Sequence, residues 1–318
     1  MHPDFYDKRF VIVAGKGGVG KSTVSAAIAL AASRRGKRVL IAELNTREKA
    51  PLLFGKSPSG YAPREIHEDI FSINITPDDA LREYGLMKLK FKAAYNLVFE
   101  NELMRKLLKM IPGMNELLLI GKAWFLEQER DRTGEPVWDM IVVDAPATGH
   151  GVSLFRLPHV ILDVVDKGPL ADDTRAIRDM LMDPHQTVLN IVTLAEEMPF
   201  TESLDLLRQT REVLKIPTGF LFVNALWPEV LDPREAEVLQ TFRSSVRGID
   251  PLVDGVVRCA RDMMQRRSMQ DEYLQRIRAH FPLPTIQVPY VFTEDFRFDA
   301  ISRIASHVDT EIQRAQRG

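Results

Sequence analysis

The most informative segment of this chain is Gly15-Lys16-Gly17-Gly18-Val19-Gly20-Lys21-Ser22-Thr23. It fits the pattern G-x-x-x-x-G-K-[ST] at every defined position. An apolar run, FVIVA at Phe10–Ala14, comes directly before it, and an alanine-rich segment with helical spacing, 22–35, follows it. Glycine-rich loops between a buried strand and a helix are the setting in which backbone N–H groups surround phosphates. The sequence therefore predicts a phosphate-binding loop rather than a glycine-rich turn without a ligand.

The residue types in this loop suit a nucleotide. Glycines let the backbone approach phosphates closely, and the helix that follows adds the partial positive charge of its N-terminus. Lys21 is placed to reach the β- and γ-phosphates, and the Ser22 hydroxyl is placed to ligate Mg²⁺. We therefore expect ATP or ADP to contact the whole run from Gly15 to Thr23, with Lys21 as a catalytic residue and Ser22 as a metal ligand.

Further apolar runs continue outward from the loop. They lie at 39–42, Ile70–Ile75, 140–143, 188–194, 220–223 and 285–288, with helical stretches between most of them. Short buried strands that alternate with helices indicate an α/β fold with a mostly parallel sheet, flanked by helices on both faces. Ligands in such folds lie at the carboxyl ends of the strands. Together with the loop, this pattern predicts a P-loop NTPase fold for a single domain spanning 1–318.

One region interrupts the alternation of strands and helices. In the segment from residue 78 to residue 130, apolar residues recur at helical spacing, with a break at Pro112-Gly113. This predicts an added helical region of two or three helices, and a shorter helical segment is expected at 156–184. The methionine-rich apolar stripe is interpreted as core, and an adaptable binding surface is the alternative. Linkers are expected at 56–63 and 131–136.

Composition excludes several classes of protein. The 318 residues are 45% hydrophobic and 27% charged, which is typical of a globular protein. A net charge of -2 argues against extensive contacts with nucleic-acid phosphates. The single cysteine, Cys259, cannot build a disulfide framework or a multi-thiolate metal site within one chain. No signal peptide and no run of about 20 apolar residues is visible, so we expect a cytoplasmic protein without a membrane span.

Several motifs resemble one known group of ATPases. GKGGVGKST resembles the deviant P-loop of the ATPases that include MinD, ParA, nitrogenase iron protein and ArsA. Within this group, VVDAPATGHGVSLFRLP resembles the switch II region of the ArsA/GET-type ATPases, and IPGM, VTLAEEMPFTESL and FVNAL agree with that branch. The resemblance covers about 10–301. It implies a nucleotide-switch ATPase that uses ATP and Mg²⁺, dimerises across ATP with an identical or homologous subunit, and controls a partner or client.

The resemblance also implies roles for individual residues. Lys16 would reach across the dimer interface to the nucleotide of the partner, and a solvent-exposed lysine is the alternative. Asp144 would coordinate Mg²⁺ through water and contribute to catalysis. Asn224 would read adenine, whereas the alternative is a structural asparagine at a strand end. Pro289 is assigned to the same nucleotide pocket.

Switch I departs from the family pattern. The family places an aspartate that positions the attacking water where this chain has Asn45, and an asparagine cannot accept the proton of that water. We therefore expect slow hydrolysis with Asn45 among the catalytic residues. Glu43, Glu48 or an aspartate of a homologous partner could substitute. The alternative function is a catalytically weak scaffold or regulatory subunit, and a ParA/MinD-like positioning ATPase ranks below it.

This chain also lacks the residues with which members of the family usually bind metals and clients. Arsenite-binding members use a cluster of thiolates and the targeting members hold zinc with a CxxC pair, but this chain has Cys259 alone. We therefore expect neither arsenite transport nor zinc. The segment 160–184 is short and charged and should supply little apolar groove, and His150 is interpreted as structural.

Overall fold

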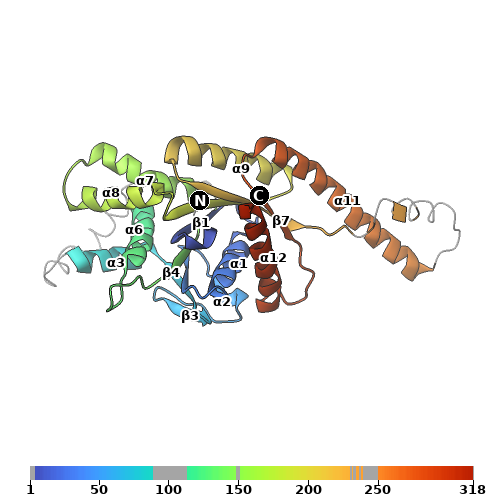
Figure 1. The fold of residues 1–318 in the computed structure, drawn as a ribbon, viewed down its shortest axis with the longest axis horizontal. Helices are drawn as coiled ribbons and strands as arrows, with labels where there is room; N and C mark the ends of the chain where they lie inside the picture. Colours follow the sequence, from blue (N-terminus) through green and yellow to red (C-terminus); the bar gives the residue numbers. More distant parts are fainter. Residues whose placement is uncertain are drawn as a thin grey trace.

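A computed structural model describes residues 4–88, 113–147, 151–229 and 250–317, together with residues 231, 234, 235 and 238. An eight-stranded sheet runs through its centre in the order β3-β4-β2-β5-β1-β6-β7-β8 (Figure 1). The strands are β1 (Phe10–Ala14), β2 (Val39–Leu44), β3 (Arg64–His67), β4 (Ile70–Ile75), β5 (Met140–Asp144), β6 (Thr187–Leu194), β7 (Thr218–Leu226) and β8 (Thr285–Pro289). All neighbouring strands are parallel except β3 and β4. The predicted mostly parallel α/β fold is confirmed.

Helices cover both faces of the sheet (Figure 1). One face packs on α1 (Lys21–Ser33), α2 (Ala50–Leu53) and α12 (Phe298–Arg317). The other packs on α6 (Met114–Gln128), α7 (Gly151–Val164), α8 (Pro169–Met182), α9 (Glu197–Gln209) and the end of α11 (Pro251–His280), while α3 (Pro77–Lys88) lies against α6. Short helical turns occur at Phe5–Asp7 and Thr210–Leu214. The central strands are buried on both faces, which explains their continuous apolar runs.

The central position of β1 fixes where the glycine-rich loop lies. β1 pairs with β5 on one side and with β6 on the other, and all five of its residues are buried. The chain connections therefore diverge around the carboxyl end of β1, which is the place where open parallel sheets bind ligands. The loop leaves β1 at that end and leads directly into α1.

Most predicted elements are confirmed with small shifts at their ends. All seven predicted strands are present, and most are longer than the apolar runs by one to five residues. The edge strand β3 was not predicted, because only Ile66 in its sequence REIH is apolar and buried. In the added helical region, α3 and α6 flank residues 89–112, which lie outside the described residues. Gly113 has a positive φ of 85° and begins α6, as the break at Pro112-Gly113 indicates.

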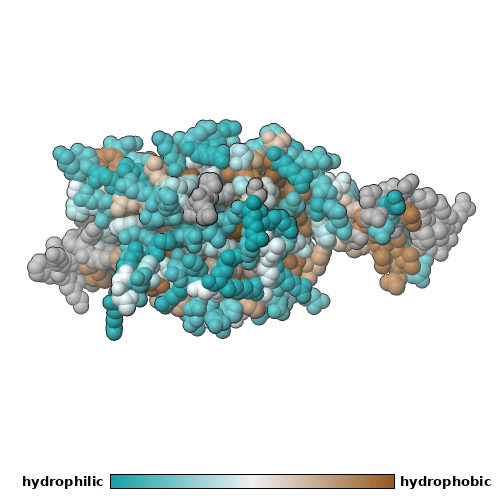
Figure 2. All heavy atoms as spheres, viewed as in Figure 1, coloured by the Kyte–Doolittle hydropathy of each residue, from teal (hydrophilic) through white to brown (hydrophobic). Residues whose placement is uncertain are grey.

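The outlying end of α11 differs from the rest of the surface. Figure 1 shows the N-terminal part of this 30-residue helix extending away from the sheet. Leu252, Val253 and Val256 are exposed there, and Figure 2 shows hydrophobic residues gathered on this end while the rest of the visible face is mostly hydrophilic. None of the described helices combines the length and the apolar composition that crossing a membrane requires.

Candidate nucleotide-binding site

Two glycines in the loop after β1 occupy positions where no side chain fits. Gly15 has φ +155°, and a Cβ there would lie 2.3 Å from the Val192 carbonyl oxygen. Gly20 has φ +92°, and a Cβ there would lie 2.0 Å from Nδ2 of Asn224. The loop is thus pressed against the ends of β6 and β7. This close approach, rather than glycine content alone, fixes the path of the backbone.

The N-terminus of α1 is open to an anion. Gly20 is its N-cap, and among the described residues no side chain accepts a hydrogen bond from the first N–H groups of the helix. These first groups have no partner within a helix, and together with the helix dipole they favour a negatively charged ligand. The helix end and the loop therefore form a site that suits phosphate.

Lys21 folds back across this loop. Its Nζ donates hydrogen bonds to the carbonyl oxygens of Gly15 at 3.0 Å and Lys16 at 2.9 Å. Burial lowers the pKa of Lys21, while the nearby Asp144 carboxylate acts in the opposite direction. The ammonium group is therefore held at the loop, where the phosphates of a nucleotide would compete for it.

Asp144 lies beside the start of α1. It ends β5, pairs in register with Val13, and is 5% exposed. The Ser22 hydroxyl donates a hydrogen bond to Oδ2 of Asp144 at 2.6 Å. No described residue donates to the other carboxylate oxygen, Oδ1, which is buried. Burial raises the pKa of Asp144, and the bond from Ser22 lowers it. A hydroxyl beside a buried carboxylate oxygen without a donor fits Mg²⁺, which prefers oxygen ligands.

Lys16 contacts a residue of its own chain. Its Nζ lies 2.5 Å from Oε1 of Glu202, and about a third of each side chain is exposed, 32% and 34%. Glu202 belongs to α9 and was not identified from the sequence. Nothing in the sequence pattern links two residues that lie 186 positions apart, so only the packing of α9 beside the loop reveals the pair.

Asn224 and Pro289 lie at the carboxyl ends of β7 and β8. Nδ2 of Asn224 donates a hydrogen bond to the Val19 carbonyl oxygen at 2.9 Å, so the side chain touches the loop directly. Pro289 is exposed and pairs with Leu226. The next residues of the two strands, Trp227 and Tyr290, stack with ring centroids 5.2 Å apart and an interplanar angle of 19°. This aromatic pair was not predicted from the sequence, because the predicted strands 220–223 and 285–288 end before the two rings, whereas β7 and β8 extend up to them.

A comparison with protein families decides the classification. The model of the family described as anion-transporting ATPase matches residues 8–171, which is half of the chain. The chain belongs to this family. The matched residues include β1, the glycine-rich loop and Asp144. The family assignment confirms the resemblance to the ArsA/GET-type P-loop ATPases, and the chain is an ATPase.

Curated relatives agree with this family. ATPase BagA of Mycobacterium tuberculosis is 31% identical over 238 residues, 71% of this chain and 68% of the relative. An ATPase ASNA1 homolog of Entamoeba dispar is 24% identical over 297 residues, 85% of this chain and 84% of that protein. ATPase GET3 of Podospora anserina is 25% identical over 236 residues, 72% of this chain and 67% of that protein.

The residue expected in switch I of this anion-transporting ATPase, Asn45, comes directly after β2. Asn45 follows the strand with φ +49°, is exposed, and donates its backbone N–H to the Ile75 carbonyl oxygen at 2.8 Å. Glu43 is fully buried, and its carboxylate accepts hydrogen bonds from the backbone N–H groups of Lys49 and Ala50. The Glu48 carboxylate accepts from two backbone N–H groups of the 56–63 linker. In this conformation backbone N–H groups donate hydrogen bonds to the carboxylates of both glutamates, so neither carboxylate is free to act as a base.

Glu43 also gives a pH-dependent prediction. Burial raises its pKa from the ordinary 4.5 to about 7, and the carboxylate of Asp144, its neighbour in the sheet register, acts in the same direction. Between pH 4.5 and about pH 7, the folded state therefore keeps a proton on Glu43 that the unfolded state has already released. We expect the stability of the wild type, relative to Glu43→Gln, to fall by about 2–3 kcal/mol as pH rises from 4.5 to 7.

Urea unfolding of both proteins across this pH range measures the difference. The comparison removes contributions from carboxylates that do not interact with Glu43, because they are the same in both proteins. Parallel curves of unfolding free energy against pH would show that Glu43 keeps an ordinary pKa in the folded protein.

Three further sequence predictions concern His150, Cys259 and the absence of a metal-binding cluster. Thr148, Gly149 and His150 lie outside the described residues, so the interpretation of His150 stays a prediction. Cys259 is an exposed thiol on α11. Within the described parts of the chain, no three His, Cys, Asp or Glu side chains gather as a metal-binding group.

Proposed function

We propose that this anion-transporting ATPase is a nucleotide switch. It binds ATP with Mg²⁺ along Gly15–Thr23, hydrolyses it slowly, and pairs face to face with a second ATPase subunit across the nucleotide to control a partner or client. The observation that carries the proposal is the contact between Ser22 and the buried Asp144, beside an ammonium group, Lys21, folded over the loop. These groups supply a cation, a metal ligand and a carboxylate at one helix end.

Each group has a defined task in the proposal. Backbone N–H groups of the loop and of α1 bind the phosphates, and Lys21 adds positive charge where negative charge accumulates during phosphoryl transfer. Ser22 and Asp144, the latter through water, would hold Mg²⁺, which neutralises phosphate charge when bound. Asn224 and Pro289 are proposed to contact the base. The hydrogen bond from the Asn224 amide to the loop supports this role for Asn224, and an amide suits an adenine edge.

Lys16 is proposed to serve the nucleotide of the partner subunit. The Glu202 carboxylate now holds its ammonium, so the phosphates of the partner's ATP have to displace Glu202. Both side chains are one-third exposed, and exposed pairs are weak, so displacement by a triphosphate is favourable. The pair in this chain is thus compatible with a resting state before dimerisation.

Two substitutions at this pair should have opposite effects. Lys16→Ala should leave the affinity of the monomer for ATP within about threefold and weaken ATP-dependent dimerisation by tenfold or more, because it removes a charge-assisted contact across the interface. Glu202→Gln should strengthen dimerisation, because the competing carboxylate is gone. Sedimentation velocity with a slowly cleaved ATP analogue measures both effects.

Glu197→Gln on the exposed first turn of the same helix α9 is the matched control. It removes the same charge without touching Lys16 and should leave dimerisation unchanged. Intact ATP-dependent dimers of Lys16→Ala would contradict the role across the interface.

A second candidate function is a catalytically weak scaffold or regulatory subunit. Two observations favour it: Asn45 replaces the carboxylate of switch I, and the nearby Glu43 and Glu48 carboxylates are bound to backbone N–H groups. Without a base near the attacking water, general-base catalysis would be missing, a contribution of about 10²- to 10⁴-fold in other enzymes.

Steady-state ATP turnover of the wild type and Asn45→Asp separates the two candidates. For the weak scaffold, the wild type should be slow and the aspartate should accelerate turnover at least about tenfold, because it restores a base. Asn45→Ser is the control, since it changes the side chain without adding a base. A wild type that already turns over quickly, with no gain from Asn45→Asp, would exclude the scaffold.

The helical region is proposed to pass the nucleotide state to a partner or client. The connection after β5 leads from Asp144 into α7, and α7 packs on both α6 and α8. Gly113, at the start of α6, lies so close to α7 that a Cβ there would be 2.3 Å from a methyl carbon of Leu157. A movement of the segment after Asp144 would therefore reach the two helices through direct packing.

A further inference from the structure

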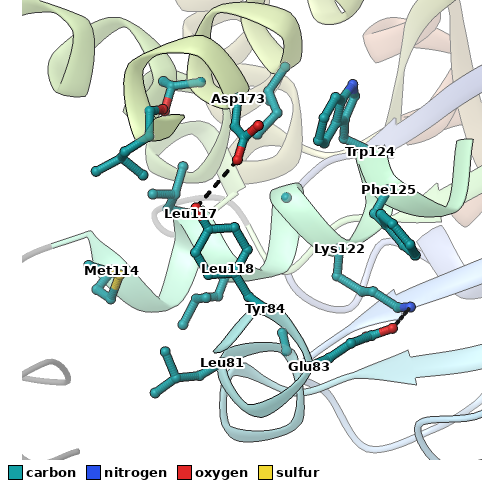
Figure 3. Close-up of a pocket in the computed structure, with 15 residues that line it drawn as sticks. Leu81, Glu83, Tyr84, Met114, Leu117, Leu118, Lys122, Trp124, Phe125 and Asp173 are labelled. Atoms are coloured by element: carbon teal, nitrogen blue, oxygen red, sulfur yellow. Dashed lines mark hydrogen bonds and ion pairs between the residues drawn. The ribbon is translucent and has the colours of Figure 1, made fainter. Parts of the chain in front are cut away.

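A cavity of about 560 Å³ lies between α3, α6 and α8 (Figure 3). It shares no residue with the glycine-rich loop. Its walls are mainly apolar and come from all three helices, with Leu81, Leu117, Leu118, Trp124, Leu170 and Ile177 among the lining residues. Protein interiors contain few voids larger than a water molecule, and small-molecule sites typically enclose about 300–1,000 Å³. The size and lining of this cavity are those of a ligand site.

The charged groups and the tyrosine hydroxyl of the cavity wall already have partners. The Lys122 ammonium lies 2.9 Å from Oε1 of Glu83, and the Tyr61 hydroxyl donates to the other oxygen of that carboxylate. On the opposite side, the Tyr84 hydroxyl donates to Asp173 at 3.3 Å (Figure 3). A ligand therefore does not have to satisfy these groups. A charged ligand would lose its hydration and would have to compete with contacts that exist already.

Gly121 also supports the interpretation of this cavity as a ligand site. It lies inside α6 and lines the cavity, and a Cβ there would meet only Cδ1 of Ile177, at 3.9 Å. Glycine is less favourable than alanine within a helix, and here no close neighbour requires it. The missing side chain leaves space open in the cavity.

We propose that this cavity binds an uncharged lipophilic small molecule. A mainly apolar pocket favours apolar guests, because binding removes apolar surface of both pocket and ligand from water. Trp124 and Phe125 give the wall flat aromatic surfaces, and the Lys122 ammonium is already placed over the Phe125 ring at 5.0 Å from its centroid. The ligand is therefore held by apolar contact and shape rather than by charge.

Three probes with the same chain length test the chemical class: dodecanol, dodecanoate and dodecylammonium, each at concentrations where it is monomeric. Isothermal titration calorimetry on the full chain should give one site for dodecanol, with at least tenfold weaker binding of both charged probes. Equal binding of all three probes, or no binding of dodecanol, would overturn the proposal.

Glycine substitutions test the location of the site. Gly121→Leu places a side chain in the cavity and should weaken dodecanol binding at least thirtyfold. Gly255→Leu is the matched control, because Gly255 also lies inside a helix, α11, and has no atom within 4 Å of a Cβ. It should leave binding unchanged.

Gly121→Ala keeps the test valid if leucine disturbs folding. One methyl group in ordinary contact with Ile177 should raise the melting temperature through helix propensity and weaken dodecanol binding only a few-fold. ATP affinity should stay unchanged in all three variants, since the nucleotide loop lies elsewhere. Undiminished dodecanol binding by a folded Gly121→Leu protein would place the probe outside this cavity.

Discussion

Lys21→Ala is expected to abolish ATP binding at ordinary nucleotide concentrations. The ammonium group lies at the loop on two carbonyl oxygens, and its removal leaves the phosphates without their nearest cation. Loss of one partner from a desolvated, hydrogen-bonded charge pair weakens binding by roughly 100-fold or more. Titration calorimetry with Mg²⁺ and a slowly cleaved ATP analogue measures the loss.

Lys56→Ala is the control for this prediction. Lys56 is an exposed lysine of the 56–63 linker, so its removal changes the net charge by the same amount without touching the loop. It should bind ATP like the wild type. Unchanged affinity of Lys21→Ala would refute the assignment of the nucleotide site, whereas an equal loss in both variants would point to a general effect of charge.

Asp144→Asn is expected to have the second largest effect, on the use of Mg²⁺. The amide can still accept the hydrogen bond from Ser22, but its negative charge is absent. Residues that orient metal-bound groups contribute about 10- to 100-fold to metal affinity or activity, so turnover should fall by this factor. The Mg²⁺ concentration that gives half-maximal turnover should rise.

Folding stability separates this effect from structural damage. Burial of an ionised carboxylate raises the pKa of Asp144, so the neutral amide should be tolerated and the variant should be at least as stable as the wild type near neutral pH. Titration of ATP turnover against Mg²⁺, with urea unfolding in parallel, gives both quantities. An unchanged Mg²⁺ requirement would exclude Asp144 from the metal site.

Much of the fold was predictable because the central strands are buried on both faces. Runs such as Phe10–Ala14 and 140–143 are apolar and rich in β-branched residues, and glycines mark the ends of several elements. β3 was not predictable in this way. It is an edge strand with two exposed residues among its four, so its pairing with β4 leaves almost no pattern in the sequence.

The site was predictable where a local sequence motif marks its residues. The loop could be identified as a unit, and Asp144 could be identified because it ends an apolar run. The contact between Lys16 and Glu202 depends on how α9 lies beside the loop. The position of Glu43 beside Asp144 depends on the register of β2 with β5. Neither tertiary arrangement follows from the spacing of residues in the chain.

A crystal structure of the protein with Mg²⁺ and a slowly cleaved ATP analogue would show whether the glycine-rich loop holds a nucleotide between two subunits. We expect a triphosphate along Gly15–Thr23, the metal ion at the Ser22 hydroxyl, and two subunits facing each other with Lys16 released from Glu202 onto the partner's phosphates. A nucleotide bound elsewhere, with this loop empty, would refute the nucleotide site proposed for this chain.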